Sequence, residues 1–298
     1  TYSKAGTLSN HDHSIITNNV ERIYIKNTGN VGIGTTDPAS YNNDGDDFVI
    51  AGTGATGMSI ASGTSSNGSI MFADGTSGTS GYRGAIKYNH ASDYMHFNTA
   101  AGERARIDSS GRLIVGATAA IANVAGTGHL QVLGTGGGDT TLTIGRFSAN
   151  ASPPTLAFTK SRNGTIGGNT IVQDGDNLGQ ITFSASDGSD MVSNSAKIEV
   201  EVDGTPGSND TPGRIGFYTT ADGGNGSVER MRIDSSGSVG IGTSSPGSYN
   251  SAGDNLVVAE TSGGAGITLA SATDGSGHIL FADSTSGTGD YDGFIRYD

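Results

Sequence analysis

The chain has 298 residues, with 50 glycines, no cysteine, no tryptophan and a formal net charge of −13 at pH 7. This charge argues against nucleic acid and anionic membranes as partners, because both bind basic surfaces, and the lack of cysteine excludes disulfides and thiol chemistry. Leu, Ile, Val and Phe contribute only 56 of the 298 residues, which is close to the composition of disordered chains. Such a chain either stays disordered or buries apolar surface against identical copies of itself.

Residues 1–19 precede the first repeated motif, and we predict that they form an N-terminal connector. The segment begins with neither an initiator methionine nor a signal peptide, so we expect a trimmed or processed start. No run in the chain approaches the eighteen apolar residues of a membrane span, so no membrane insertion is expected. His11 and His13 flank Asp12 and would lie on one side of an extended segment. Around a three-fold axis they would offer six nitrogens to a divalent metal; a solvated polar turn is the alternative.

Residues 29–38 have the sequence GNVGIGTTDP. This pattern has two interpretations, a phosphate-binding loop or a structural element. A dinucleotide-binding loop needs G-x-G-x-x-G followed directly by a helix, whereas here the third glycine is missing and turn-forming residues follow. A strand period of two places Val31 and Ile33 on one face and Gly32 and Gly34 on the other. A glycine face admits a second backbone at close range. We therefore predict a strand at a crowded contact between chains.

The same pattern occurs three times, which favours architecture because a ligand loop is normally used once. Each copy starts with a Glu-Arg pair, at Glu21-Arg22, Glu103-Arg104 and Glu229-Arg230, with offsets of 82 and 126 residues. The third copy repeats the glycine pattern as Val239, Gly240, Ile241 and Gly242, and the middle copy is degenerate. These offsets divide the chain into repeat modules at 20–101, 102–227 and 228–298, of which the second is longer and the third incomplete.

The third module stops inside a repeating unit. Residues 279–283 echo 70–74, and residues 291–297 echo 82–88. We therefore expect the natural chain to continue past Asp298, with a further Glu-Arg motif near position 312, because a unit cut at this point would leave open strand edges.

Alternation of apolar and polar residues predicts strands at 180–184, 197–202, 214–218 and 230–234, separated by glycine-rich turns. No window predicts a helix. Each strand is too poor in apolar residues to complete a sandwich alone, so three chains wound together would close the sheets and supply the core. The predicted fold is all-β: an elongated, repetitive, intertwined trimer resembling a β-prism or a triple-stranded β-helix. A flexible glycine-rich linker array is the alternative.

The motif E-R-M-R-I-D-S-S-G-x-V-G-I-G-T-x-x-P at 229–246, with a looser copy at 21–38, resembles the recurring shaft motif of tail fibre and tailspike proteins from tailed bacteriophages. Residues 196–207 and 212–223 are similar to a second block common in these fibres. The resemblance implies a homotrimeric, extracellular virion appendage that is joined to other tail proteins. It also implies a tip, expected beyond Asp298, that binds a glycan or protein on the host surface. Such fibres often end in a self-cleaving chaperone domain, and no stretch here matches one.

Patterns that would indicate chemistry are weak. Asp44-Gly45-Asp46-Asp47 and the acidic turn 174–177 lack the spacing and the closing glutamate of a calcium loop, and G-x-S-x-G is absent. A pair of catalytic carboxylates would be spatial rather than sequential, so a glycosidase site stays open. The recurring Glu-Arg pairs instead predict repeated cross-strand ion pairs. We predict a structural shaft rather than an enzyme; a polysaccharide-cleaving tailspike and a trimeric bacterial surface adhesin are the alternatives.

Overall fold

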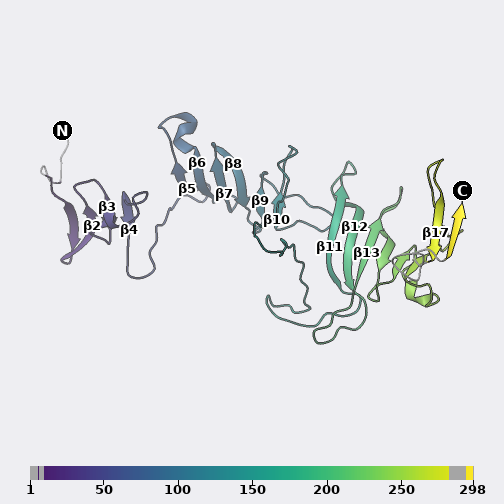
Figure 1. The fold of residues 1–298 in the computed structure, drawn as a ribbon. Coiled ribbons are helices and arrows are strands. Elements are labelled where there is room, and N and C mark those ends of the chain that lie inside the picture. The colour runs from purple at the N-terminus through teal and green to yellow at the C-terminus, as the bar shows by residue number, and fades with distance from the viewer. Residues whose placement is uncertain (1–5, 7–9, 282–292, 298) are drawn as a thin grey trace. The chain divides into compact units, whose positions relative to one another are not determined.

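The computed structural model describes residues 6, 10–281 and 293–297, and these residues form an all-β protein with glycine-rich turns, as predicted (Figure 1). The helices among them are three short 3-10 turns, at Pro38–Ser40, Gly78–Tyr82 and Pro246–Ser248. The chain divides into two units, Thr1–Thr118 and Ala119–Asp298. Residues 282, 283, 291 and 292 of the predicted echoes, and residues 1–5 and 7–9 of the predicted connector, lie outside the described residues.

The first sheet of unit one contains β1 (His13–Thr17), β2 (Val20–Ile25), β3 (Val31–Ile33) and β4 (Phe48–Ile50). Neighbouring strands are antiparallel except β3 and β4, which run parallel. The β1–β2 turn consists of Asn18 and Asn19, whose φ angles of 50° and 56° match the two-residue turn that suits the twist of a hairpin.

A second sheet in unit one contains β5 (Asn67–Phe72), β6 (Gly84–Asn89), β7 (Tyr94–Thr99), β8 (Gly102–Ile107) and β9 (Leu113–Val115). These five strands pair in chain order, each antiparallel to the next. The β7–β8 turn again has two residues with positive φ, but here both are alanines, Ala100 and Ala101. Alanine adopts this conformation only at a cost, so the tight turn is strained.

Unit two begins with β10 (Leu130–Val132), followed by a sheet of six strands: β11 (Asn177–Ala185), β12 (Ser193–Val202), β13 (Gly213–Thr219), β14 (Val228–Ile233), β15 (Val239–Ile241) and β16 (Leu256–Val258). Figure 1 shows β11, β12 and β13 side by side. The pairs are antiparallel up to β15, and β16 runs parallel to β15, as β4 does to β3. A separate hairpin joins β17 (Gly277–Phe281) and β18 (Gly293–Tyr297).

The sheets group the strands differently from the predicted modules. The boundary predicted at residue 102 falls in the turn between β7 and β8, and the one at 228 falls between β13 and β14, yet both strand pairs are hydrogen-bonded within one sheet. The Glu-Arg motif therefore lies in the last part of each sheet and does not open a new structural unit. The reason is that short connections bring the motif strand back against the strand before it.

Few apolar side chains are buried within the single chain. Among the described residues, the buried apolar set consists of Val49, Ala85, Ile114, Val172, Val202 and Val257. Val49 and Val257 occupy the same position in β4 and β16, on the face covered by the loop that follows β3 or β15. The remaining large apolar residues need surface from elsewhere if they are to leave water.

Candidate assembly surface

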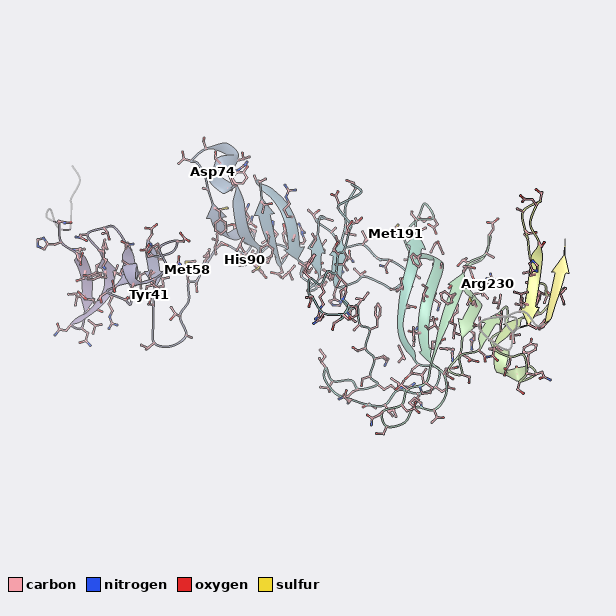
Figure 2. The ribbon with its side chains drawn as sticks, viewed as in Figure 1. Tyr41, Met58, Asp74, His90, Met191 and Arg230 are labelled. Atoms are coloured by element: carbon pink, nitrogen blue, oxygen red, sulfur yellow. The ribbon has the colours of Figure 1, made fainter. Side chains whose placement is uncertain are left out.

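The first arginine of each motif copy is the extra residue of a β-bulge. Ile15 pairs with Ile23 and Ile16 with Glu21, which leaves Arg22 without a facing residue, and the registers around Arg104 and Arg230 skip in the same way. Each of these guanidinium groups donates through Nε to a threonine Oγ1 of the preceding strand. The three pairs are Arg22–Thr17 at 3.0 Å, Arg104–Thr99 at 3.3 Å and Arg230–Thr219 at 3.1 Å; Arg230 is labelled in Figure 2.

The bulge brings the motif glutamate and the second arginine onto one face. Residues three apart normally project from opposite faces of a strand, and the extra residue corrects this parity. Glu229 accepts hydrogen bonds from Arg232 Nε at 2.7 Å and Nη2 at 2.6 Å, and Glu103 accepts the same pair from Arg106 at 2.5 and 2.9 Å. The hydrogen bonds that Arg232 donates to Glu229 raise the pKa of its guanidinium.

The predicted cross-strand pairing of glutamate with arginine is therefore wrong for Glu103 and Glu229. Each of these glutamates forms its ion pair with the arginine three residues later on the same strand. The adjacent arginine is the bulge residue and bonds a threonine instead. In the first copy Tyr24 stands at the second arginine position, and its hydroxyl donates to Asp12. The threonine partners were not recognised from the sequence, although a threonine ends the strand before each motif.

One face of the sheet β11–β16 carries a network of charges that satisfy one another. Arg214 lies 3.0 Å from both Glu201 and Asp203, and the Tyr218 hydroxyl contacts Glu201 at 3.5 Å. Burial, together with the neighbouring carboxylates, raises the pKa of Tyr218. The whole network comprises Lys197, Glu199, Glu201, Asp203, Arg214, Tyr218, Glu229 and Arg232. Each carboxylate in it is ion-paired.

The glycines of the motif are required by contacts within the chain. A Cβ on Gly240 would lie 2.5 Å from the backbone oxygen of Thr243, and one on Gly242 would lie 2.1 Å from the backbone oxygen of Ala259. Gly242 also has a φ of 73°, which disfavours side chains. Gly32 and Gly34 in the first copy make the same contacts. The close approach predicted for these glycines exists, but its prediction as a contact between chains is wrong, since the crowding atoms belong to the following loop and to the end of the parallel strand.

The opposite face of each sheet is apolar and stays exposed. In the sheet β11–β16, one row of paired residues runs Ile181, Ile198, Phe217, Met231, Ile241, Val258. Ile181 is 47% exposed, Phe217 36% and Ile241 40%. Equivalent rows are Ile15, Ile23, Ile33, Ile50 in the first sheet and Ile70, Ile86, Phe97, Ala105, Val115 in the second. We call these surfaces the apolar faces. Val31 and Ile33, like Val239 and Ile241, lie on them, as the period of two predicts.

The two candidate metal ligands lie at the start of β1. Asp12, between them, accepts hydrogen bonds from the Tyr24 hydroxyl at 2.5 Å and the Asn27 amide at 2.8 Å, and these bonds lower the pKa of its carboxyl. His13 pairs with Ile25 and so belongs to the apolar face. The described residues hold no group of three or more His, Asp or Glu side chains that could bind a metal within one chain. A site built from His11 and His13 of three chains stays a prediction.

The acidic turns considered for calcium have roles in the fold. Asp174 accepts a hydrogen bond from the Gly204 amide at 2.8 Å, and Asp176 is paired with Arg162 through contacts of 2.6 and 2.7 Å. The guanidinium holds the pKa of Asp176 far below the ordinary value for an aspartate. Asp44 lies in a turn closed by a bond from the Gly45 amide to the Asn42 carbonyl.

Comparison with known proteins gives similarity at the level of fold. No protein-family model and no curated protein matches the chain. A structure of the carboxy-terminal domain of the bacteriophage T5 L-shaped tail fibre, with its intra-molecular chaperone domain, matches with a TM-score of 0.51 and 15% identity, over 78% of this chain and 67% of that one. A second structure of that carboxy-terminal domain matches with a TM-score of 0.47 and 16% identity, over 70% and 86%. No helix in the described residues has the length and apolar character needed to span a bilayer.

Proposed function

We propose that this chain is a segment of the shaft of a homotrimeric bacteriophage tail fibre, a structural virion protein that positions a host receptor-binding tip. The observation that carries the proposal is the two-faced character of the sheets. One face is a closed network of ion pairs suited to water, and the other is a continuous apolar face that the chain leaves exposed. Sheets of this kind bury their apolar faces against a second layer, and identical chains supply that layer in a symmetric assembly.

The accessible surface of the chain supports the same proposal. A folded monomer of 29.9 kDa exposes about 11,700 Å², whereas this chain exposes 21059 Å². The excess, roughly 9,000 Å², is larger than most obligate subunit interfaces. An assembly that buried it would also supply the core that a composition so poor in large apolar residues does not provide within one chain.

In the proposed trimer the apolar faces point inward and the charged faces outward. The chain acts as a spacer outside the cell, on the virion, and its partners are two further copies of itself, other tail proteins and, through the tip, a host-surface glycan or protein. It is not an enzyme in this proposal, because the carboxylates of its charged face are held in ion pairs. The all-β fold shared with a T5 tail fibre domain supports the assignment.

Light scattering on the purified chain tests the proposal, and we expect a mass three times the 29.9 kDa of one chain. Two neighbouring residues of β11 provide matched variants. Ile181 lies on the apolar face and Gln180 on the charged face opposite Glu199. We expect Ile181→Lys to abolish the trimer, because a lysine ammonium would be buried without a partner, and Gln180→Lys to preserve it. A folded monomer, or a trimer that survives Ile181→Lys unchanged, would overturn the proposal.

A further inference from the structure

Three short segments have the sequence of a strand but lie outside every strand of the structure. They are Met58-Ser59-Ile60, Leu156-Ala157-Phe158 and Ile267-Thr268-Leu269, in which large apolar residues alternate with small ones. Within the described residues, the backbone N–H and C=O groups of these nine positions make no hydrogen bonds to other backbone groups. We call them the alternating segments.

Each alternating segment crosses the apolar face of a sheet at a glycine. A Cβ on Gly68 would lie 3.4 Å from the Ile60 carbonyl oxygen, one on Gly179 would lie 2.8 Å from Phe158 Cβ, and one on Gly277 would lie 3.7 Å from Leu269 Cβ. These glycines belong to the first strands of their sheets, β5, β11 and β17. Gly68 pairs with Tyr88, and Gly179 with Val200, whose side chains are on the apolar faces. The lack of a side chain lets the crossing segment come close to the sheet.

The alternating segments remain open to water on their other side. Met58 is 60% exposed, Leu156 61% and Ile267 70%. In the trimer proposed above, a neighbouring chain would cover the apolar faces and these segments with them. Backbone groups that are buried in this way must find hydrogen-bond partners, because an unpaired buried N–H or C=O costs as much as a lost hydrogen bond.

The same sheets offer unused hydrogen-bonding edges. Among the described strands, β5 pairs only with β6, β11 only with β12 and β17 only with β18. The outer edge of each first strand is therefore a row of open donors and acceptors. The alternating segment that precedes each of these strands in the sequence passes over the face of the sheet, at the glycine of that strand, rather than along its open edge. The edge is thus left for another chain.

We infer that the three alternating segments form strands with neighbouring copies of this chain, so that the copies exchange backbone hydrogen bonds three times along the described sequence. The inference rests on the proposed trimer and names the residues that interlock it. Its basis is that an orphaned alternating segment, a glycine beneath it and an open strand edge recur together in all three places. A chain that exposes roughly 9,000 Å² beyond a compact monomer has ample surface for such exchange.

Hydrogen exchange measured by mass spectrometry on the purified full chain tests the inference. We expect the amides of residues 57–61, 155–159 and 266–270 to exchange about 100-fold or more slowly than those of the glycine-rich loop 134–138, and at rates similar to strand β12. Without a partner chain, these segments have no hydrogen bonds to slow their exchange.

The outcomes separate this inference from the proposed function. Slow exchange in a particle of three chains supports both. A particle of three chains in which the alternating segments exchange as fast as loop 134–138 overturns the strand exchange and leaves the fibre-shaft proposal standing. A folded monomer overturns both.

Discussion

Gly242→Ala tests whether crowding or backbone conformation makes the motif glycine necessary. Alanine at a φ of 73° costs about 1–2 kcal/mol. Its Cβ would also lie 2.1 Å from the Ala259 carbonyl oxygen, so the end of β16 must move away from β15. Forced displacement of a packed backbone costs about 1–3 kcal/mol. The expected loss is about 2–5 kcal/mol per chain, or roughly 4–15 °C in Tm for a chain of this size.

Two further glycines supply the controls. Gly237 has a φ of 87° with no atom within 4 Å of its Cβ position, so Gly237→Ala should cost only the conformational 1–2 kcal/mol or so. Gly247 has neither constraint, and the first copy carries Ala39 in its place, so Gly247→Ala should change stability by less than about 0.5 kcal/mol. Thermal unfolding at one fixed chain concentration ranks the three variants. Equal melting of Gly242→Ala and Gly237→Ala would show that the carbonyl contact is unimportant and refute the reasoning.

Three other variants give distinct expectations. Glu229→Gln should lower the free energy of unfolding by about 1–2 kcal/mol, because it removes a half-buried bidentate ion pair. A variant that melts like the parent protein, both without added salt and at high salt, would contradict this. Arg162 holds the pKa of the Asp176 carboxyl below the pKa that it has in the unfolded chain. The ion pair therefore stabilises the protein at pH values above the unfolded-state pKa, and this stabilisation is lost as the pH falls through the lower, folded-state pKa. Thermal unfolding between pH 7 and pH 2 should therefore show that Asp176→Asn is less stable than the parent at neutral pH and approaches the parent in acid. A difference in Tm that stays the same across this pH range would contradict the prediction. Ala100→Asn combined with Ala101→Gly should raise stability by about 1 kcal/mol, because the pair relieves two left-handed alanines; an unchanged Tm would mean that the turn is not strained.

The sequence allowed the faces of the strands to be predicted but not the pairing of the motif side chains. Strict alternation in β3 placed Val31 and Ile33 together, because a period of two depends only on local geometry. The pairing of Glu229 with Arg232 depends on a bulge at Arg230, and a bulge is a property of two strands in register. On a regular strand, a spacing of three places two side chains on opposite faces. Only the recurrence of a threonine before each Glu-Arg pair carried a trace of the bulge.

The predicted role of the glycines failed for a related reason. The spacing of Gly240 and Gly242 indicated that another backbone segment comes close to them. Spacing alone does not say whether that segment belongs to the same chain or to a neighbouring one. The neighbour of Gly240 is the loop that begins at Thr243 and continues to Pro246, which is fully buried. This loop has to pass over the strand in order to bring β16 alongside β15 in parallel. A short parallel connection of this kind could be identified only once β16 was known to pair with β15.

The middle copy of the motif differs from the third copy at three corresponding positions. Where the third copy has Gly240, Pro246 and Val257, the middle copy has Ile114, Ala120 and Gln131. Ile114 is 0% exposed, so its side chain fills interior space that a glycine would leave empty. Gln131 is also buried, and its amide bonds both the N–H and the carbonyl of the loop residue 121 at 2.9 and 2.8 Å. In the middle copy, a side-chain amide therefore holds the loop.

Burial of Ile114 gives a prediction for the middle copy. Ile114→Gly restores the glycine of the flanking copies without their proline, and it removes a fully buried side chain, so we expect a loss of about 3–5 kcal/mol in thermal unfolding. The matched control is Gly247→Ala, which changes a position that has no atom within 4 Å of the added Cβ. A loss for Ile114→Gly as small as that of Gly247→Ala would show that the Ile114 side chain contributes nothing to packing in the folded chain.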